Sequence, residues 1–174
     1  AGKMISREVV VIGGGPSGLA AAIEAARRGA DVLVVDSNLK AGGQLFKQIH
    51  KFFGSSAHRA GTRGMDIGEE LLDEAEKYGV EIWLGSIAIG LFEEKVVAIE
   101  IGSDDESKRV VTVKAQKIVI ATGASENVVR FKGWTLPGVM GAGAAQTMVN
   151  INRVLPGNRV LMVGTGNVGL IVSY

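Results

Sequence analysis

Cysteine is absent from all 174 residues of the chain. Its absence excludes disulfide bonds, thiolate metal sites and a redox-active cysteine pair within this sequence. The charges nearly balance, with 19 Lys and Arg against 18 Asp and Glu, so no field is available to attract nucleic acid or an anionic membrane surface. Two histidines without clustered acids predict no metal site. No apolar run approaches the roughly 20 residues that span a bilayer, and residues 1–8 lack the apolar region of a signal peptide. A soluble cytoplasmic protein is expected, without nucleic-acid or membrane partners.

Glycine is abundant instead, with 25 residues among a chain that is 47% apolar. Continuous apolar runs at residues 9–12 and 32–35 are typical of strands covered on both faces. Between them, apolar positions at helical spacing end at Gly29, which is a common helix terminator. The order strand, helix, strand indicates a βαβ unit and therefore a parallel sheet.

The remaining segments extend this α/β pattern. In chain order we predict a long functional loop at 37–61, an amphipathic helix at 67–78, a strand at 80–84, a small antiparallel meander at 87–113, a buried strand at 118–121, a helix at 141–152 and a strand at 160–163. The predicted fold class is α/β: a Rossmann-like domain with a parallel sheet and a β-meander crossover, followed by the start of a second Rossmann unit.

The first motif is Gly13-x-Gly15-x-x-Gly18, directly behind the opening strand. In such a motif the first glycine permits a tight turn, the second lets a pyrophosphate approach the backbone, and the third lets the helix pack closely on the sheet. The helix N-terminus offers unpaired N–H groups and partial positive charge to a diphosphate. Asp36, at the end of the next strand, is placed to accept hydrogen bonds from ribose hydroxyls and to repel a 2′-phosphate. FAD or NAD, rather than NADP, is the expected ligand; the alternative is a glycine turn that binds nothing.

A second motif, Gly164-x-Gly166-x-x-Gly169, follows the apolar run at 160–163. The acid that would complete it lies beyond Tyr174, so NAD and NADP stay equally open as its ligand.

Two such motifs about 150 residues apart resemble the flavoproteins with two dinucleotide-binding domains, the broad family of glutathione reductase and thioredoxin reductase. Residues 11–18 look like that family's FAD fingerprint, residues 42–45 are similar to the segment that runs toward the flavin, and residues 120–123 resemble its second FAD motif. The resemblance implies FAD here and NAD(P) in the full-length protein. The implied FAD-binding residues are Gly13, Gly15, Pro16, Ser17, Gly18, Asp36, Ser37, Gly43, Gln44, Leu45, Ile87, Ala121, Thr122 and Gly123, and the nicotinamide nucleotide would bind at Gly164, Gly166 and Gly169.

Departures from the broad family narrow the resemblance. Residues 136–145 stand where thioredoxin reductases have their cysteine pair, so disulfide reduction by this stretch is excluded. Residues 134–139 are instead similar to the large subunits of heterotetrameric sarcosine oxidase, dye-linked proline dehydrogenases and hydrogen cyanide synthase. This similarity implies a small-molecule amine or amino-acid substrate and partner subunits, with a homo-oligomer as the alternative.

The expected domains are the N-terminal part of an FAD-binding domain at 1–125, a connecting segment at 126–157 and the start of a truncated NAD(P)-binding domain at 158–174. The helix behind Gly166 is too short to cover its strand, so the chain is expected to be a fragment that is inactive alone. The function we expect is that of an FAD-dependent oxidoreductase that passes hydride or electrons between FAD and a nicotinamide or amine donor. The alternatives are a non-catalytic dinucleotide-binding module and a flavin-free NAD-dependent dehydrogenase. No catalytic acid or base is assigned.

Overall fold

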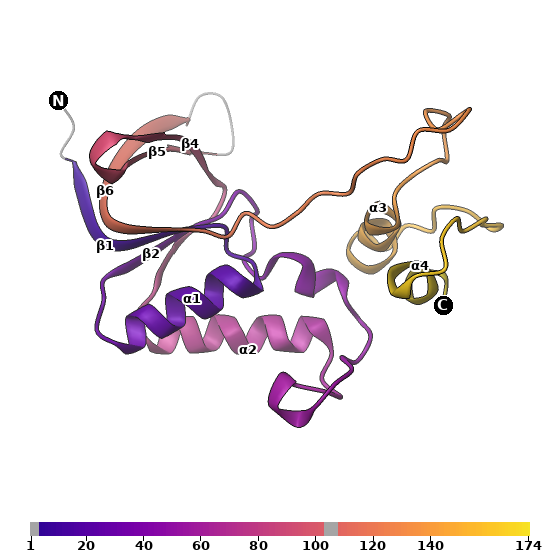
Figure 1. The fold of residues 1–174 in the computed structure, drawn as a ribbon, viewed down its shortest axis with the longest axis horizontal. Helices are drawn as coiled ribbons and strands as arrows, with labels where there is room; N and C mark the ends of the chain where they lie inside the picture. Colours follow the sequence, from indigo (N-terminus) through magenta and orange to yellow (C-terminus); the bar gives the residue numbers. More distant parts are fainter. Residues whose placement is uncertain (1–3, 103–107) are drawn as a thin grey trace. The chain divides into compact units, whose positions relative to one another are not determined.

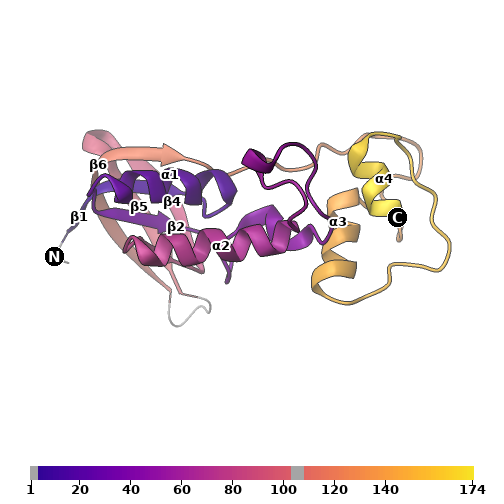
Figure 2. The same ribbon diagram turned by 90° about the horizontal axis from the view of Figure 1, so that it is seen from below.

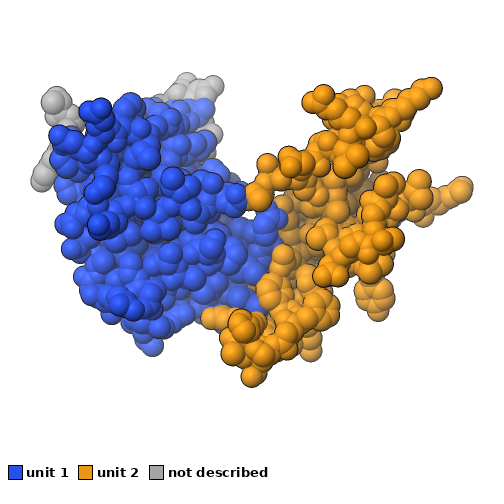
Figure 3. Space-filling view, viewed as in Figure 1, with its two compact units in different colours: residues 1–45, 66–123 blue, residues 46–65, 124–174 orange. Residues whose placement is uncertain are grey.

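The computed structural model describes residues 4–102 and 108–174. The chain divides into two compact units that do not follow its order (Figure 3). Unit 1 comprises residues 1–45 and 66–123, and unit 2 comprises residues 46–65 and 124–174. Unit 1 contains the first glycine motif, and unit 2 contains the second.

Unit 1 is built on a sheet in which six strands of the described residues have the order β3-β2-β1-β6-β5-β4. In chain order the strands are β1 (Ile5–Ile12), β2 (Val32–Val35), β3 (Glu81–Trp83), β4 (Ser86–Phe92), β5 (Val96–Ile101) and β6 (Arg109–Ile120). β3, β2, β1 and β6 pair in parallel, whereas β4, β5 and β6 pair antiparallel. The predicted α/β class, with a parallel sheet and a meander crossover, is confirmed.

Two helices cover one face of the parallel strands, and the meander covers the other (Figures 1 and 2). These helices are α1 (Pro16–Arg27) and α2 (Gly64–Lys77), and an ion pair between Arg27 and Glu74 joins them. Side chains alternate along each strand. Val10 therefore packs toward the meander, while the Cγ1 of Val11 lies on the side where α1 approaches the strand.

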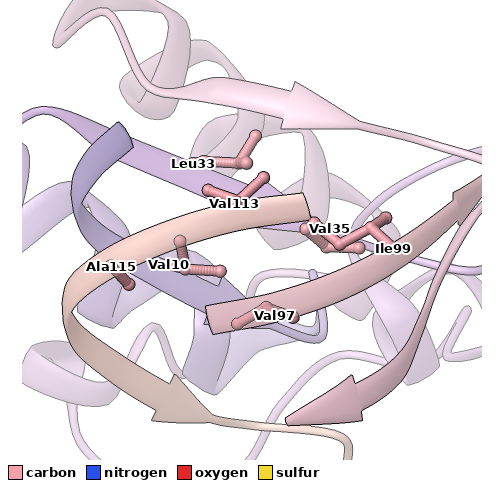
Figure 4. Close-up of a cluster of buried hydrophobic side chains, with 7 residues drawn as sticks. All are labelled: Val10, Leu33, Val35, Val97, Ile99, Val113 and Ala115. Carbon is pink, nitrogen blue, oxygen red and sulfur yellow. The ribbon is translucent and has the colours of Figure 1, made fainter. Parts of the chain in front are cut away.

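The layer beneath the meander is a cluster of seven buried side chains (Figure 4). Its members come from the strands that meet there: Val10, Leu33, Val35, Val97, Ile99, Val113 and Ala115. Each fully buried aliphatic side chain of this size stabilises the fold by about 1.5–3 kcal/mol, before the entropic cost of ordering it. This double-sided burial explains the continuous apolar runs in β1 and β2.

The structure corrects the prediction of a separate buried strand at 118–121. β6 is a single strand that forms the last strand of the meander and then continues beside β1. Beyond Lys114 only β1 pairs with it among the described residues, so its far edge is uncovered and Ile120 keeps 69% of its surface exposed. β1 also begins earlier than predicted, because Ile5 to Arg7 pair with β6 although they have no partner in β2.

The long loop contains two 3-10 turns, Gly43–Lys47 and Ser56–His58. In unit 2 the predicted helix at 141–152 is confirmed as α3 (Ala142–Gln146), continued by a π-helical turn at Thr147–Ile151. The Nδ2 of Asn150 donates a hydrogen bond of 2.6 Å to the carbonyl of Lys47, which joins the two chain segments of this unit. Within the described ranges, no helix has the length and apolar composition to cross a membrane.

The strand predicted at 160–163 is not formed. Val160, Leu161 and Val163 are largely exposed, and the backbone there has no ladder partner in the described part of the chain. A strand is stable only when a neighbour satisfies its backbone groups. The turn and the helix that follow, α4 (Asn167–Ser173), are nevertheless present.

Candidate dinucleotide-binding site

The turn between β1 and α1 requires glycine at both of its ends. Gly13 has φ of +105°, and a Cβ there would lie 2.2 Å from the carbonyl oxygen of Ala121 on the neighbouring strand. A Cβ on Gly18 would lie 1.9 Å from the carbonyl oxygen of Gly13. The two glycines therefore let the backbone of β1, β6 and α1 converge at one point, as the sequence motif predicts.

Gly15 differs from these two glycines, because nothing lies within 4 Å of the position its Cβ would take. It is the N-cap of α1, and no side chain caps the helix there. Pro16 follows it without an N–H, and the first turn has no acidic residue. The N–H groups of that turn thus keep their capacity to bind an anion, in open space beside backbone that has no side chain. These features fit a diphosphate.

Asp36 lies beside this turn and is 6% exposed. Its Oδ2 accepts a hydrogen bond of 2.6 Å from the N–H of Gly14, and its Oδ1 accepts bonds from the backbone N–H and the Nδ2 of Asn38 at 2.7 and 2.8 Å. A Cβ on Gly14 would lie 2.9 Å from that Oδ2. Gly14 is therefore constrained by the carboxylate, although it stands at a variable position of the motif.

The loop behind β2 returns to the same turn. The N–H of Gly42 donates to the carbonyl of Gly14 at 2.6 Å, and a Cβ on Gly43 would lie 3.0 Å from the Cα of Gly15. Of the two residues that follow, Leu45 is buried and Gln44 is exposed. The segment that resembles a flavin-directed loop thus begins against the first glycine motif.

The end of β6 reaches the turn from the other side. The N–H of Ala121 donates to the carbonyl of Ile12 at 2.8 Å, so Thr122 and Gly123 leave the sheet beside Gly13, with φ of +78° at Gly123. Ile87 follows Ser86 at the start of β4 and is 47% exposed.

The predicted site residues of unit 1 thus fall into one neighbourhood at the carboxyl ends of the parallel strands. Gly13, Gly15, Gly18, Asp36, Gly43 and Ala121 are brought together by the contacts above, and Pro16, Ser17, Ser37, Gln44, Leu45, Thr122 and Gly123 adjoin them in sequence. Ile87 is one residue from Ser86, whose N–H donates to the carbonyl of Asp36 at 3.0 Å. Sequence reasoning missed Gly14, Asn38 and Gly42. Three consecutive glycines and an Asx pattern after the acid were the only available signals.

The largest cavity of unit 1, about 700 Å³, lies elsewhere. It is a recess at the amino-terminal ends of β1 and the parallel part of β6, lined by charged side chains that include Arg7, Lys114 and Lys117. None of the residues that line it belongs to a glycine motif, so the cradle at Gly13–Gly18 is an open edge of the sheet rather than an enclosed pocket.

The second motif in unit 2 reproduces the local geometry of the first. Gly164 has φ of +117° where Gly13 has +105°. Gly166 caps α4 with φ of −73° and ψ of 173°, close to the values of −74° and −177° at Gly15. A Cβ on Gly169 would lie 2.4 Å from the carbonyl oxygen of Gly164, much as one on Gly18 would with Gly13. The same turn is therefore built twice.

Comparisons with known proteins agree with this geometry. Residues 7–174 match the pyridine nucleotide-disulphide oxidoreductase family. One of the two relatives considered, an opine oxidase component from Agrobacterium tumefaciens, is 34% identical over 170 residues, which cover 91% of this chain and 32% of that protein. The other, the hydrogen cyanide synthase component HcnB of Pseudomonas aeruginosa, is 32% identical over 166 residues, covering 90% of this chain and 33% of that protein.

Among solved structures, an L-proline dehydrogenase from P. horikoshii has a TM-score of 0.76 and 25% sequence identity. The match covers 89% of this chain and 30% of that one. The chain therefore spans about a third of the length of these relatives.

Proposed function

Since the chain belongs to the pyridine nucleotide-disulphide oxidoreductase family, we propose that it provides the FAD-binding part of a flavin-dependent oxidoreductase. The resemblance to the group of amine- and amino-acid-oxidising flavoproteins is confirmed by the relatives. The observation that supports the cofactor site most strongly is the open, uncapped N-terminus of α1 at Gly15, with the buried carboxylate of Asp36 beside it.

Each part of this site has a distinct role in the proposal. The N–H groups at the head of α1 bind the diphosphate, and Gly15 keeps the space beside them open. Asp36 accepts a ribose hydroxyl, and the segments at 43–45 and 121–123 approach the rest of the cofactor. When bound, FAD supplies the two-electron redox chemistry, while the protein positions it and excludes unproductive orientations.

The names of the relatives suggest a substrate class. An opine and proline, the compounds in two of these names, are both secondary amines with an adjacent carboxylate. We propose that the full-length protein takes part in oxidising an amine of this class to an imine, with loss of two electrons and two protons to the flavin. No residue of this chain is assigned to proton transfer. The second motif, with the geometry of the first, would bind NAD or NADP.

The relatives are named as subunits of larger enzymes. We therefore propose that the protein works with partner subunits, and that a homo-oligomer is the alternative that a mass measurement of the purified protein would reveal. We place the protein in the cytoplasm, because this is where its proposed nicotinamide cosubstrate is maintained. Cell fractionation would test that placement.

The visible spectrum of the purified protein tests the cofactor, and anaerobic titration tests the reaction. A flavin spectrum that is bleached by proline, sarcosine or an opine supports amine oxidation, whereas bleaching by NADH or NADPH alone supports a nicotinamide donor. A bound flavin that no donor reduces would favour a non-catalytic module. A colourless protein that binds NAD and cannot be loaded with FAD would refute the flavin assignment.

A further inference from the structure

The carboxylate of Asp36 is almost fully occupied by the protein itself. A carboxylate has about four acceptor positions, two on each oxygen. The Oδ1 accepts from both the backbone N–H and the Nδ2 of Asn38, and the Oδ2 accepts from the N–H of Gly14. In the part of the chain that the structure describes, these three donors are the complete set for Asp36. One acceptor position is left, on Oδ2.

A ribose has two neighbouring hydroxyls, so one acceptor position is insufficient to bind both. The nearest further acceptor is the amide of Asn38, whose side chain is exposed and already lies 2.8 Å from Asp36 through its Nδ2. Within the described ranges its Oδ1 accepts no hydrogen bond, and its Nδ2 donates only the bond to Asp36. We propose that Asn38 is a specificity-determining residue that binds one hydroxyl of the adenosine ribose while Asp36 binds the other. This inference rests on the proposed function.

The backbone holds Asn38 in the position that this role requires. The carbonyl of Asn38 accepts a hydrogen bond of 2.9 Å from the N–H of Gly85, and the carbonyl of Asp36 accepts one of 3.0 Å from the N–H of Ser86. Both residues are thereby fixed to the junction between β3 and β4. Because the Nδ2 is bound to Asp36, the carbonyl oxygen of the amide points away from the carboxylate and toward solvent. The hydroxyl reader is therefore ordered before a ligand arrives.

The test uses the full-length protein, stripped of flavin, and compares ADP with 2′-deoxy-ADP and 3′-deoxy-ADP by calorimetry. The wild-type protein should bind ADP more tightly than either deoxy analogue, by about 2- to 12-fold, which is the value of one neutral hydrogen bond. Asn38→Ala should abolish this preference at one hydroxyl and keep it at the other. Leu39→Ala, an exposed neighbour, is the matched control and should keep both preferences.

The ratio of affinities separates recognition from a structural role. If Asn38→Ala weakens all three nucleotides equally, the residue only supports the loop and the proposal is overturned; unchanged ratios overturn it as well. Titration of the same wild-type protein with FAD keeps the two levels apart. Binding of ADP without binding of FAD would refute the proposed function and leave Asn38 testable, whereas failure to bind ADP would refute both.

Discussion

Replacing Gly15 with alanine should weaken cofactor binding without weakening the fold. The backbone at Gly15 has φ of −74° and ψ of −177°, which alanine adopts without strain, and nothing lies within 4 Å of the new methyl group. Alanine restricts the unfolded chain and so stabilises by about 0.4–1 kcal/mol, but it is a poorer N-cap than glycine by a similar amount. The free energy of unfolding should therefore change by less than about 1 kcal/mol.

The same methyl group would occupy the space through which the diphosphate approaches the head of α1. Overpacking of this kind costs about 1–3 kcal/mol, so FAD should bind about 5- to 150-fold more weakly. Fluorescence titration of the flavin-free protein measures the affinity, and urea denaturation without FAD measures the stability.

Gly18→Ala is the matched control, because it adds the same methyl group three residues away. There the Cβ would lie 1.9 Å from the carbonyl oxygen of Gly13, and no side-chain rotation relieves a contact with backbone. The strain of about 3 kcal/mol exceeds the gain of about 1 kcal/mol in helix propensity. We expect a net loss of about 2 kcal/mol of stability. If Gly15→Ala binds FAD normally, or destabilises the protein as much as Gly18→Ala does, the assignment of the open position to the diphosphate is wrong.

Three further predictions concern the carboxylates and the second motif. Asp36→Asn should lower both FAD affinity and stability, each by about 1.5–3 kcal/mol, because charge-assisted hydrogen bonds are replaced by neutral ones; unchanged affinity would exclude a ribose contact. Although partial burial opposes ionisation of Glu81, hydrogen bonds from Trp83 and Arg7 and the charge of Arg7 hold its pKa below the usual 4.5, so its contribution to stability is complete above that value and is lost as the pH falls through the lowered pKa. Glu81→Gln should therefore flatten the acid limb of a stability profile, and an unaltered profile would contradict this. Gly166→Ala should leave bound flavin in place and reduce binding of NADH or NADPH by about 5- to 150-fold; equilibrium dialysis measures this, and undiminished binding would count against the second motif.

The fold of unit 1 was largely predictable because its strands are buried on both faces. Runs such as residues 9–12 and 32–35 have no polar interruption, and the glycines between them mark the turn. The continuity of β6 was not predictable in the same way. Lys114, Gln116 and Lys117 interrupt the apolar pattern and indicate a linker, whereas the structure places only Ala115 of this stretch in the core. The strand near residue 160 failed for the opposite reason, since an apolar run forms a strand only where it has a partner.

The candidate site was predictable where the motif itself encodes the geometry, as at Gly13, Gly15 and Gly18. Gly14 and Asn38 were missed because their roles depend on where the carboxylate of Asp36 lies. Gly14 is 22 residues away from Asp36 in the chain, and its need for glycine arises from a contact with that side chain rather than from its own turn. Asn38 looks like an ordinary loop residue until the acceptors of Asp36 are counted.

The length of β6 has a mechanical consequence for the cradle. At its centre, Val113 is paired with Ile5 on one side and with Val97 on the other, so a single strand sets the alignment of both the parallel and the antiparallel ladders. Slippage by one residue would turn Val113 and Ala115 out of the core and would also carry the carbonyl of Ala121 away from Gly13. The buried layer under the meander thus acts as a ruler for the distant end of the strand, and an insertion within residues 109–120 would misplace the backbone around the first glycine turn even though every motif residue remained intact.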